Sequence, residues 1–440
     1  MRVLVAEKIS DEGIEILNGC AEVDVKLGLK PEELASLIAD YEALVVRSQT
    51  KVTPEIINAG KKLQVIARAG IGIDNVNVDE ATRCGIVVVN APTGNTISAA
   101  EHTMALMLSL ARHIPQANSS LKSGEWRRSD FMGTELRNKT LGIIGLGSVG
   151  SEVARRALGM EMRLIGYDPF VSLENARNLK VELYELERLL EEADFITLHL
   201  PLTGTTRNLI GEKELHLVKT DVRIINCARG GLIDEAELVR AVRENRVAGA
   251  AIDVFPKEPV TDSILFESDR IIVTPHLGAS TAEAQMTVSR DVAMQIADVF
   301  RGKPARYSVN APFISAEMLS ILAPFMKAVH TMGRVVSQLA EGQMNTIKIY
   351  YEGEITGFDT NALKASVLGG ILEEISEERV NVVNANIVAT ERGLMVVEQK
   401  EASCENYSSL VTIEATTSSG VITVAGTVMR GELHIVRVNE

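Results

Sequence analysis

The chain has 440 residues, 46% of them hydrophobic, and a formal net charge of −14. This length suits about three domains, and the acidic balance argues against nucleic acid or an anionic membrane surface as a partner. The four cysteines lack CxxC spacing and so predict neither a metal site nor disulfides, which suits a cytoplasmic protein, and no apolar run approaches the ~20 residues of a membrane span.

Residues 1–97 alternate short apolar strands with helical patterns, which predicts a parallel, doubly wound sheet. The strands are expected at VLVA, ALVV, LQVIA and IVVV, and helices at Pro31–Asp40 and Pro54–Lys61. The first strand-to-helix turn, Glu7–Gly13, lacks the glycine pattern that binds phosphate groups. We therefore expect this domain to hold a substrate rather than a cofactor.

Two loops of this first domain are candidates for substrate contact. Arg47 follows a strand in VVRSQT, and the loop RAGIGID contains Gly70 and Gly72, which let the backbone approach a ligand. Taken alone, Arg47 fits a solvated arginine at a strand end equally well.

The next helical pattern, Ser98–Arg112, carries no catalytic motif and leads through SGEWRRSDF to the centre of the chain. Trp126, the only tryptophan, lies here beside Arg127 and Arg128. It fits either an aromatic anchor at a subunit contact, which we favour, or a core residue with a basic rim.

The stretch from Asn138 to Pro169 has the pattern of a strand, a glycine turn, a helix and a second strand. Strands are expected at Leu141–Ile144 and Arg163–Tyr167, with GLGSVG between them and a helix over Val149–Gly159. This is GxGxxG in the position that dinucleotide-binding βαβ units require.

The residue types in this unit suit a pyrophosphate and a ribose. Gly145 permits the tight turn, Gly147 lets backbone N–H groups approach the anion, and Gly150 permits close packing of helix on strand. Asp168 ends the second strand and can accept a bond from a ribose 2′-hydroxyl. A 2′-phosphate there would meet a like charge, costing roughly 4 kcal/mol per unit pair at ~4 Å, so we expect NAD rather than NADP.

Four later strands are nearly continuously apolar, as a parallel sheet buried on both faces requires. They are FITLHLP, VRIINCARGG, GAAIDVF and RIIVTPHLG. Ligands bind beyond the carboxyl ends of such strands. We therefore expect Arg229, Asp253, Glu258 and His276 to converge on one crevice.

These residue types suit hydride transfer from an alcohol to a nicotinamide. His276 can accept the hydroxyl proton, since an unperturbed histidine pKa of ~6.5 lies near working pH. Glu258 can fix the tautomer of His276, and Arg229 offers a fork matched to a carboxylate. The other six histidines are interpreted as structural or solvent-facing: His102, His113, His199, His216, His330 and His434.

Beyond a helical stretch from Ala284 to Phe300 and the linker RGKPARYSVNAP, residues 311–440 read as an α+β domain. Helices are expected over Ser315–Glu341 and Asn361–Ser376. Strands are expected over Asn345–Tyr351, Val382–Val388, Leu394–Gln399, Val411–Ala415, Val421–Val428 and Glu432–Val438.

The ordered motifs GLGSVG, NCARGG, DVFPKEP and TPHLGAST, with Asp168, resemble those of the D-isomer-specific 2-hydroxyacid dehydrogenases over about residues 1–310. The resemblance implies a flavodoxin-like substrate domain from 1–97 and 285–310, and a Rossmann NAD domain over 98–284. Residues 311–440 then form a third, α+β domain.

The same resemblance implies roles for individual residues. His276 is the general acid/base, Glu258 supports it, and Arg229 binds the substrate carboxylate and carbonyl. Residues implied around NAD are Ile71, where relatives often carry threonine, Gly145, Gly147, Ser148, Val149, Gly150, Asp168, Leu200, Pro201, Cys227, Ala228, Arg229, Asp253, His276 and Gly278. Residues implied around the substrate are Arg47, Gly70, Gly72, Asn95, Arg229 and His276.

Within the family, VNAPTGNTISAAEH, SGEWRR, FDTNALKASVLGGIL and GELHIVRV are similar to long members with an intervening, regulatory domain. These imply oxidation of 3-phospho-D-glycerate to 3-phosphooxypyruvate, the first step of L-serine biosynthesis, by a cytoplasmic homotetramer or homodimer. Long members continue into a small serine-sensing ACT domain. The sequence ends at Glu440, so either it is a piece of a longer chain or the protein lacks that sensor.

Two alternatives remain open from the sequence. One is another D-2-hydroxyacid dehydrogenase or reductase, acting on hydroxypyruvate, glyoxylate, D-lactate or 2-oxoglutarate. The other is a non-catalytic NAD-sensing protein, which the presence of Arg229, Glu258 and His276 disfavours.

Overall fold

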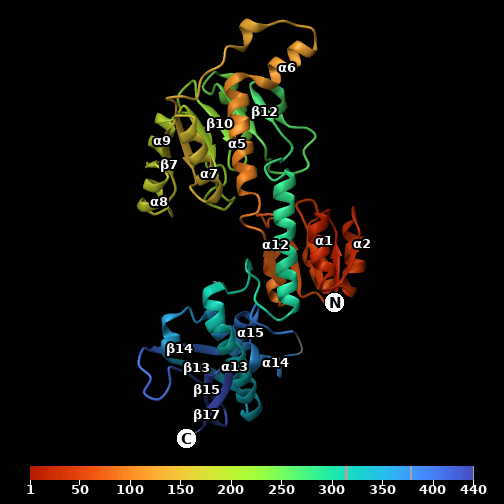
Figure 1. The fold of residues 1–440 in the computed structure, drawn as a ribbon, viewed down its shortest axis with the longest axis vertical. Helices are drawn as coiled ribbons and strands as arrows, with labels where there is room; N and C mark the ends of the chain where they lie inside the picture. Colours follow the sequence, from red (N-terminus) through yellow and green to blue (C-terminus); the bar gives the residue numbers. More distant parts are fainter. Residues whose placement is uncertain (313–315, 377–378, 440) are drawn as a thin grey trace. The chain divides into compact units, whose positions relative to one another are not determined.

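The computed structural model describes residues 1–312, 316–376 and 379–439, and its strands form three separate sheets (Figure 1). The chain divides into two compact units, one of Met1–Pro92 with Val288–Glu440 and the other of Thr93–Thr287. Among the described residues, no helix combines the length and apolar character needed to cross a membrane.

The first sheet has the order β2-β1-β3-β4-β5 with all strands parallel, the flavodoxin-like arrangement. Its strands are β1 Arg2–Val5, β2 Glu22–Val25, β3 Ala43–Val46, β4 Val65–Arg68 and β5 Val87–Asn90. Its helical segments are α1 Asp11–Asn18, α2 Pro31–Leu37, η1 Ile38–Asp40, α3 Pro54–Ala59 and α4 Val78–Arg83. The predicted doubly wound sheet is confirmed, but β2 was missed because Glu22 and Asp24 interrupt its apolar pattern at the sheet edge.

The second sheet has the order β12-β11-β10-β9-β6-β7-β8, again all parallel. Its strands are β6 Thr140–Ile144, β7 Arg163–Tyr167, β8 Glu182–Leu183, β9 Phe195–Leu198, β10 Arg223–Asn226, β11 Gly249–Ile252 and β12 Ile271–Val273. The strand order reverses between β6 and β9. That switch point is where an open α/β sheet binds its ligand.

Helices and 3₁₀ turns of this unit connect its strands, and some of the helices lie against the sheet (Figure 1). They are α5 Thr96–Arg112, α6 Ile114–Lys122, η2 Arg128–Phe131, α7 Ser148–Gly159, α8 Leu173–Asn178, α9 Leu186–Glu192, α10 Glu212–Leu215, α11 Glu235–Arg243, η3 Ile264–Glu267 and α12 Ala282–Phe300, which runs on into the first unit. The long helix α5 packs against α7, β10 and β11. It therefore backs the strands whose ends carry the candidate site.

The third sheet has the order β14-β13-β15-β16-β17 and mixes parallel and antiparallel pairs. Its strands are β13 Met344–Gly353, β14 Met395–Glu401, β15 Ser409–Thr417, β16 Gly420–Met429 and β17 Glu432–Val438. Its helical segments are α13 Ala316–Leu339, η4 Glu354–Gly357, α14 Asn361–Glu373 and α15 Ala385–Glu391. Ile347, Ile349 and Tyr351 alternate along β13 into the core. The predicted first helix residue, Ser315, lies outside the described residues.

The strand predicted over Val382–Val388 is wrong, because this segment forms a turn that leads into α15. Asn381 Oδ1 accepts a bond from the Val383 N–H at 2.9 Å, and Asn384 Oδ1 accepts one from the Asn381 N–H at 2.9 Å. Asparagine side chains that bind nearby backbone favour turns over strands. The valines and isoleucine suggested a strand, but this local bonding decided the conformation.

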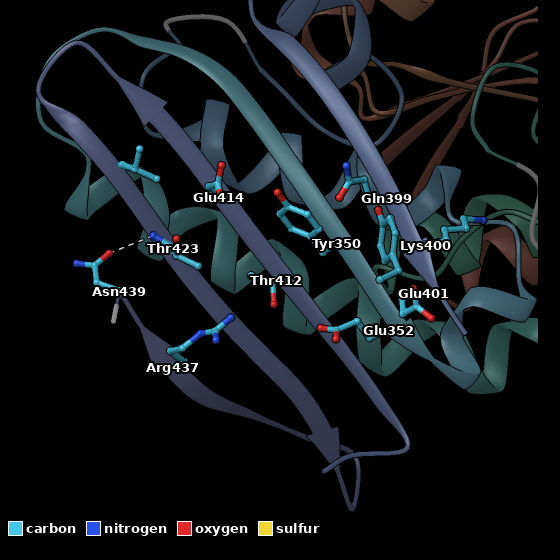
Figure 2. Close-up of a pocket in the computed structure, with 12 residues that line it drawn as sticks. Tyr350, Glu352, Gln399, Lys400, Glu401, Thr412, Glu414, Thr423, Arg437 and Asn439 are labelled. Carbon is cyan, nitrogen blue, oxygen red and sulfur yellow. Dashed lines mark hydrogen bonds between the residues drawn. The ribbon is translucent and has the colours of Figure 1, made fainter. Parts of the chain in front are cut away.

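A hollow of about 910 Å³ lies on the C-terminal sheet (Figure 2). Figure 2 shows Tyr350, Thr412, Thr423 and Arg437 on four strands around it. Its charged lining residues are Glu352, Lys400, Glu401, Glu414 and Arg437. None of the residues that line it comes from either parallel sheet, so the hollow is distinct from the site predicted beyond the strand ends of the second sheet.

Candidate active site

The turn between β6 and α7 has the geometry that a dinucleotide requires. Gly145 has a φ of +95°, and a Cβ there would lie 2.5 Å from the His199 carbonyl oxygen. A Cβ on Gly150 would collide with the Gly145 carbonyl, whereas one on Gly147 would meet no atom of the described part of the chain within 4 Å. The turn is thus closed on its protein side and open at Gly147, where Ser148 and Val149 begin α7.

Asp168 follows β7 and binds this turn directly. One carboxylate oxygen accepts from the Leu146 N–H at 2.8 Å, and the other accepts from the Phe170 N–H at 2.8 Å and the Val171 N–H at 3.2 Å. The carboxylate is partly exposed at the end of the second strand. It therefore lies where an acid can accept a bond from a ribose hydroxyl.

The segment after β9 closes the turn from the side. Leu200 packs against Gly145, and the Pro201 carbonyl accepts from the Thr206 hydroxyl at 2.7 Å. Burial lowers the pKa of His199 to about 3, so this histidine is neutral, and its Nε2 lies 3.0 Å from the Thr197 hydroxyl. A neutral, hydrogen-bonded His199 acts as a structural support of the turn.

His276 follows β12 and is paired with Glu258. Its Nδ1 lies 2.7 Å from Glu258 Oε2, and Glu258 Oε1 accepts from the Phe255 N–H at 3.0 Å. Burial alone would raise the pKa of Glu258, but the bonds from His276 and Phe255 outweigh it, so the net pKa lies below its ordinary value. Glu258 is therefore ionised at neutral pH and requires a hydrogen on Nδ1, which leaves Nε2 to exchange a proton.

Asp253, at the end of β11, organises the backbone around His276. It is fully buried, its two oxygens accept from the Leu277 N–H at 2.8 Å and the Gly278 N–H at 3.0 Å, and its carbonyl accepts from the His276 N–H at 2.8 Å. His276 has a φ of +55°, a left-handed conformation that persists only where surrounding bonds determine it.

Arg229, Cys227 and Ala228 occupy the loop after β10. Arg229 Nη1 donates to the Ala228 carbonyl at 2.7 Å, and the Ala228 N–H donates to Asn226 Oδ1 at 3.0 Å. A Cβ on Gly230 would collide with the Phe255 backbone, so this glycine lets the loop lie against the Glu258 segment. Burial, reinforced by Asp253, raises the pKa of Cys227 to about 12, which keeps the thiol protonated.

Of the predicted substrate residues, Arg47 lies in a loop held from two sides. Glu7 accepts from the N–H groups of Arg47 at 2.8 Å, Gln49 at 3.3 Å and Thr50 at 2.8 Å. Asn75 Nδ2 donates to the Arg47 carbonyl at 2.7 Å and the Thr50 carbonyl at 2.6 Å. These roles of Glu7 and Asn75 were not predicted from the sequence. The position of Glu7, an acidic residue just after the first strand, could have indicated that it binds a neighbouring loop.

The glycine loop follows β4 in the same unit. Gly70 has a φ of +150°, its carbonyl accepts from the Ala91 N–H at 3.0 Å, and Asn90 Nδ2 donates to the Ile71 carbonyl at 2.6 Å. Gly72 lies next to Ile71 in the same loop. Asn95 belongs to the other unit, where it begins α5 and its buried Oδ1 has no hydrogen-bond partner among the described residues.

The residues of the Thr93–Thr287 unit fit NAD. The open α7 N-terminus at Gly147 can take a pyrophosphate, and Asp168 can take a ribose hydroxyl. The His276 loop follows β12, a parallel strand of the same sheet. Sequence reasoning missed the support of this loop by His102 and Thr274. An available signal was that Ser98 and His102 lie four residues apart, and so on one face, of a helix that is largely apolar.

Comparisons with known proteins agree with this geometry. Residues 104–278 match the model for the D-isomer specific 2-hydroxyacid dehydrogenase NAD binding domain, and residues 321–439 match that for the D-3-phosphoglycerate dehydrogenase intervening domain. The solved apo-structure of D-lactate dehydrogenase from Escherichia coli is 26% identical with a TM-score of 0.63, covering 70% of this chain and 100% of that one. Fold and site thus define an NAD-dependent D-2-hydroxyacid dehydrogenase.

Relatives that align with the whole of this chain define the family more narrowly. D-3-phosphoglycerate dehydrogenase of a Synechocystis species is 47% identical over 100% of this chain and 80% of its own length. That of Archaeoglobus fulgidus is 44% identical over 100% of this chain and 84% of its own length. The chain belongs to the D-3-phosphoglycerate dehydrogenase family.

Proposed function

We propose that this protein oxidises 3-phospho-D-glycerate at C2 to 3-phosphooxypyruvate, the first step of L-serine biosynthesis. The observation that carries the chemistry is the 2.7 Å bond between His276 Nδ1 and an ionised Glu258 on the strand-end side of an NAD-binding sheet. The identity of 41–47% to relatives named for this substrate supports its choice.

The proposed reaction begins with the substrate carboxylate paired to the Arg229 guanidinium. His276 Nε2 accepts the C2 hydroxyl proton, while Glu258 stabilises the imidazolium that forms. NAD, when bound, supplies the acceptor for the hydride that leaves C2. In the reverse direction His276 returns the proton to the carbonyl oxygen.

Arg47 is proposed to bind the phosphate. Since Glu7 and Asn75 bond to the backbone of residues 47–50, the guanidinium stands on a fixed loop. Losing a charge-assisted bond costs ~1.5–3 kcal/mol, so Arg47→Ala should lower kcat/KM for 3-phosphoglycerate roughly 10-fold to 100-fold. An unphosphorylated 2-hydroxy acid should be much less affected.

The test measures reduced nicotinamide absorbance with a panel of 2-hydroxy acids, using wild type, Arg47→Ala and the control Arg83→Ala. Arg83 is an exposed cation of the same unit that pairs with Glu80. Equal losses on phosphorylated and unphosphorylated substrates would contradict the phosphate role. Preference for glyoxylate, hydroxypyruvate or D-lactate would favour a different dehydrogenase, and NAD binding without turnover would favour a sensor.

We also propose a cytoplasmic homo-oligomer in which a second copy covers the segment after α6. Trp126 is 81% exposed and Met132 is 83% exposed, with Leu121 nearby in sequence and also exposed. Exposed apolar side chains concentrated in one segment are typical of an interface. Light scattering should show a dimer or tetramer that Trp126→Ala weakens. In this oligomer Arg128, two residues from Trp126, is proposed to reach the cleft of the neighbouring subunit, and a fully active monomer would exclude that role.

A further inference from the structure

A second histidine, His102 on α5, lies behind the loop that carries His276. Its Nε2 is 3.1 Å from Asp253 Oδ1 and 3.3 Å from the Thr274 hydroxyl oxygen. The His102 side chain is 19% exposed and the Asp253 side chain is fully buried. A buried carboxylate requires such partners, because an unpaired one is costly.

The direction of these bonds follows from the chemistry of the three groups. The Thr274 hydroxyl donates to Asp253 Oδ1 at 2.6 Å, so its oxygen can only accept from His102. An ionised carboxylate also only accepts. His102 Nε2 must therefore carry a hydrogen, which it shares between Asp253 and Thr274.

This donor acts on the same carboxylate that shapes the catalytic loop. Both Asp253 oxygens are engaged by the Leu277 and Gly278 N–H groups. Burial alone would raise the pKa of Asp253, but the bonds from His102, Thr274 and the Leu277 N–H lower it below its ordinary value. A charged Asp253 is the stronger acceptor for the two amides that hold His276 in its left-handed conformation.

One turn earlier, α5 contacts the same loop again. The Ser98 hydroxyl lies 2.8 Å from the Thr281 hydroxyl, and a Cβ on Gly278 would lie 3.8 Å from Ala99 Cβ. Residues 98, 99 and 102 fall on one helix face. That face therefore supports the loop from Thr274 to Thr281 at both ends.

A metal ion is a weaker explanation of the same cluster. The ligand atoms of His102, Cys227 and Asp253 lie within 4.8 Å of one another. However, both Asp253 oxygens already accept hydrogen bonds from groups of the protein. Hydrogen bonding within the protein accounts for the arrangement.

We propose that His102 is a positioning residue for the dehydrogenase: through Asp253 it fixes the backbone of residues 276–278 and so the placement of His276. The inference rests on the acid–base role of His276 in the proposed function. His102 itself does not touch the substrate. Its effect is on the geometry from which the proton is transferred.

Two polar substitutions separate this role from general destabilisation. In His102→Gln the amide nitrogen can take the place of Nε2 and donate to Asp253. In His102→Asn the amide nitrogen takes the place of Nδ1 instead, which is too far from Asp253 to donate to it. Glu101→Gln, at an exposed neighbour on the same helix, is the control. Each variant is compared by kcat and KM at saturating NAD, and by hydrogen–deuterium exchange over residues 274–281 without NAD.

We expect His102→Asn to speed exchange at residues 277 and 278 and to lower kcat by at least roughly 10-fold, since misplacement by ~1 Å can cost up to ~100-fold. KM for the substrate should change less, and His102→Gln and Glu101→Gln should stay near wild type. Unchanged exchange or unchanged kcat in His102→Asn would overturn the inference. Faster exchange in a protein whose wild type shows no turnover would instead refute the proposed function.

Discussion

Replacing Glu258 by glutamine tests the acid–base pair most directly, because it changes charge while preserving shape. Glutamine keeps one oxygen, which can accept from His276 Nδ1, now 2.7 Å from Glu258 Oε2, whereas its amide nitrogen replaces the oxygen that accepts from the Phe255 N–H at 3.0 Å. It removes the negative charge that stabilises the imidazolium formed when His276 takes the C2 proton. The substitution should therefore act on the transition state more than on ground-state binding.

The magnitude follows from the geometry of the pair. A hydrogen bond to a charged group contributes ~1.5–3 kcal/mol. The His276 and Glu258 side chains are 38% and 33% exposed, so solvent screening favours the lower end of this range. About 1.5 kcal/mol corresponds to a decrease in kcat of roughly 10-fold.

The assay follows reduced nicotinamide at saturating NAD and 3-phosphoglycerate, with thermal unfolding as a check on the fold. Glu267→Gln is a matched control, because Glu267 pairs with Arg243 at the surface of the same unit. We expect kcat to fall in Glu258→Gln with little change in KM, and neither to change in the control. Wild-type kcat in a folded Glu258→Gln protein would refute the role given to Glu258.

Three further predictions concern other parts of the same unit. His276→Ala should lower kcat at least ~100-fold, as expected for a lost general base, while NAD affinity measured by calorimetry stays within a few-fold; turnover near wild type would exclude His276 as the base. Gly145→Ala should lower the unfolding free energy by at least roughly 2 kcal/mol and weaken NAD binding, since φ is +95° and the new Cβ would lie 2.5 Å from the His199 carbonyl oxygen; unaltered denaturant unfolding would contradict this. Burial alone would raise the pKa of Asp194, but the bonds from Lys219 and from the Thr140 N–H lower it below its ordinary value. The ionised Asp194 therefore stabilises the fold at neutral pH, and this stabilisation is lost as pH falls through the pKa of the folded state. The Asp194→Asn protein should have a lower free energy of unfolding at neutral pH, and that free energy should depend less on pH in the acid range.

The elements most accurately predicted were those whose local pattern and tertiary environment agree. The glycine turn, α7 and β7 follow the sequence closely, because a parallel sheet buried on both faces demands the same apolar runs that signal a strand. Val382–Val388 was wrong because the asparagines bond locally and form a turn. The edge strand β2 was missed because pairing with β1, rather than its own composition, makes it a strand.

For the candidate site, the sequence indicated which strand ends carry reactive side chains and predicted that His276 and Glu258 would face one another. It did not predict that Asp253 accepts from His102, Thr274, Leu277 and Gly278. Residues 102 and 253 are far apart in the chain. Only the packing of α5 behind β11 brings them together.

The sequence by itself determined the fold class, the cofactor turn and the identity of the reactive groups, because glycine spacing and apolar periodicity are local consequences of covalent structure. Tertiary structure alone decided how those groups are oriented. The tautomer of His276 and the left-handed backbone at that residue depend on hydrogen bonds whose partners come from separate elements. Such bonds form only after the sheet and α5 have packed.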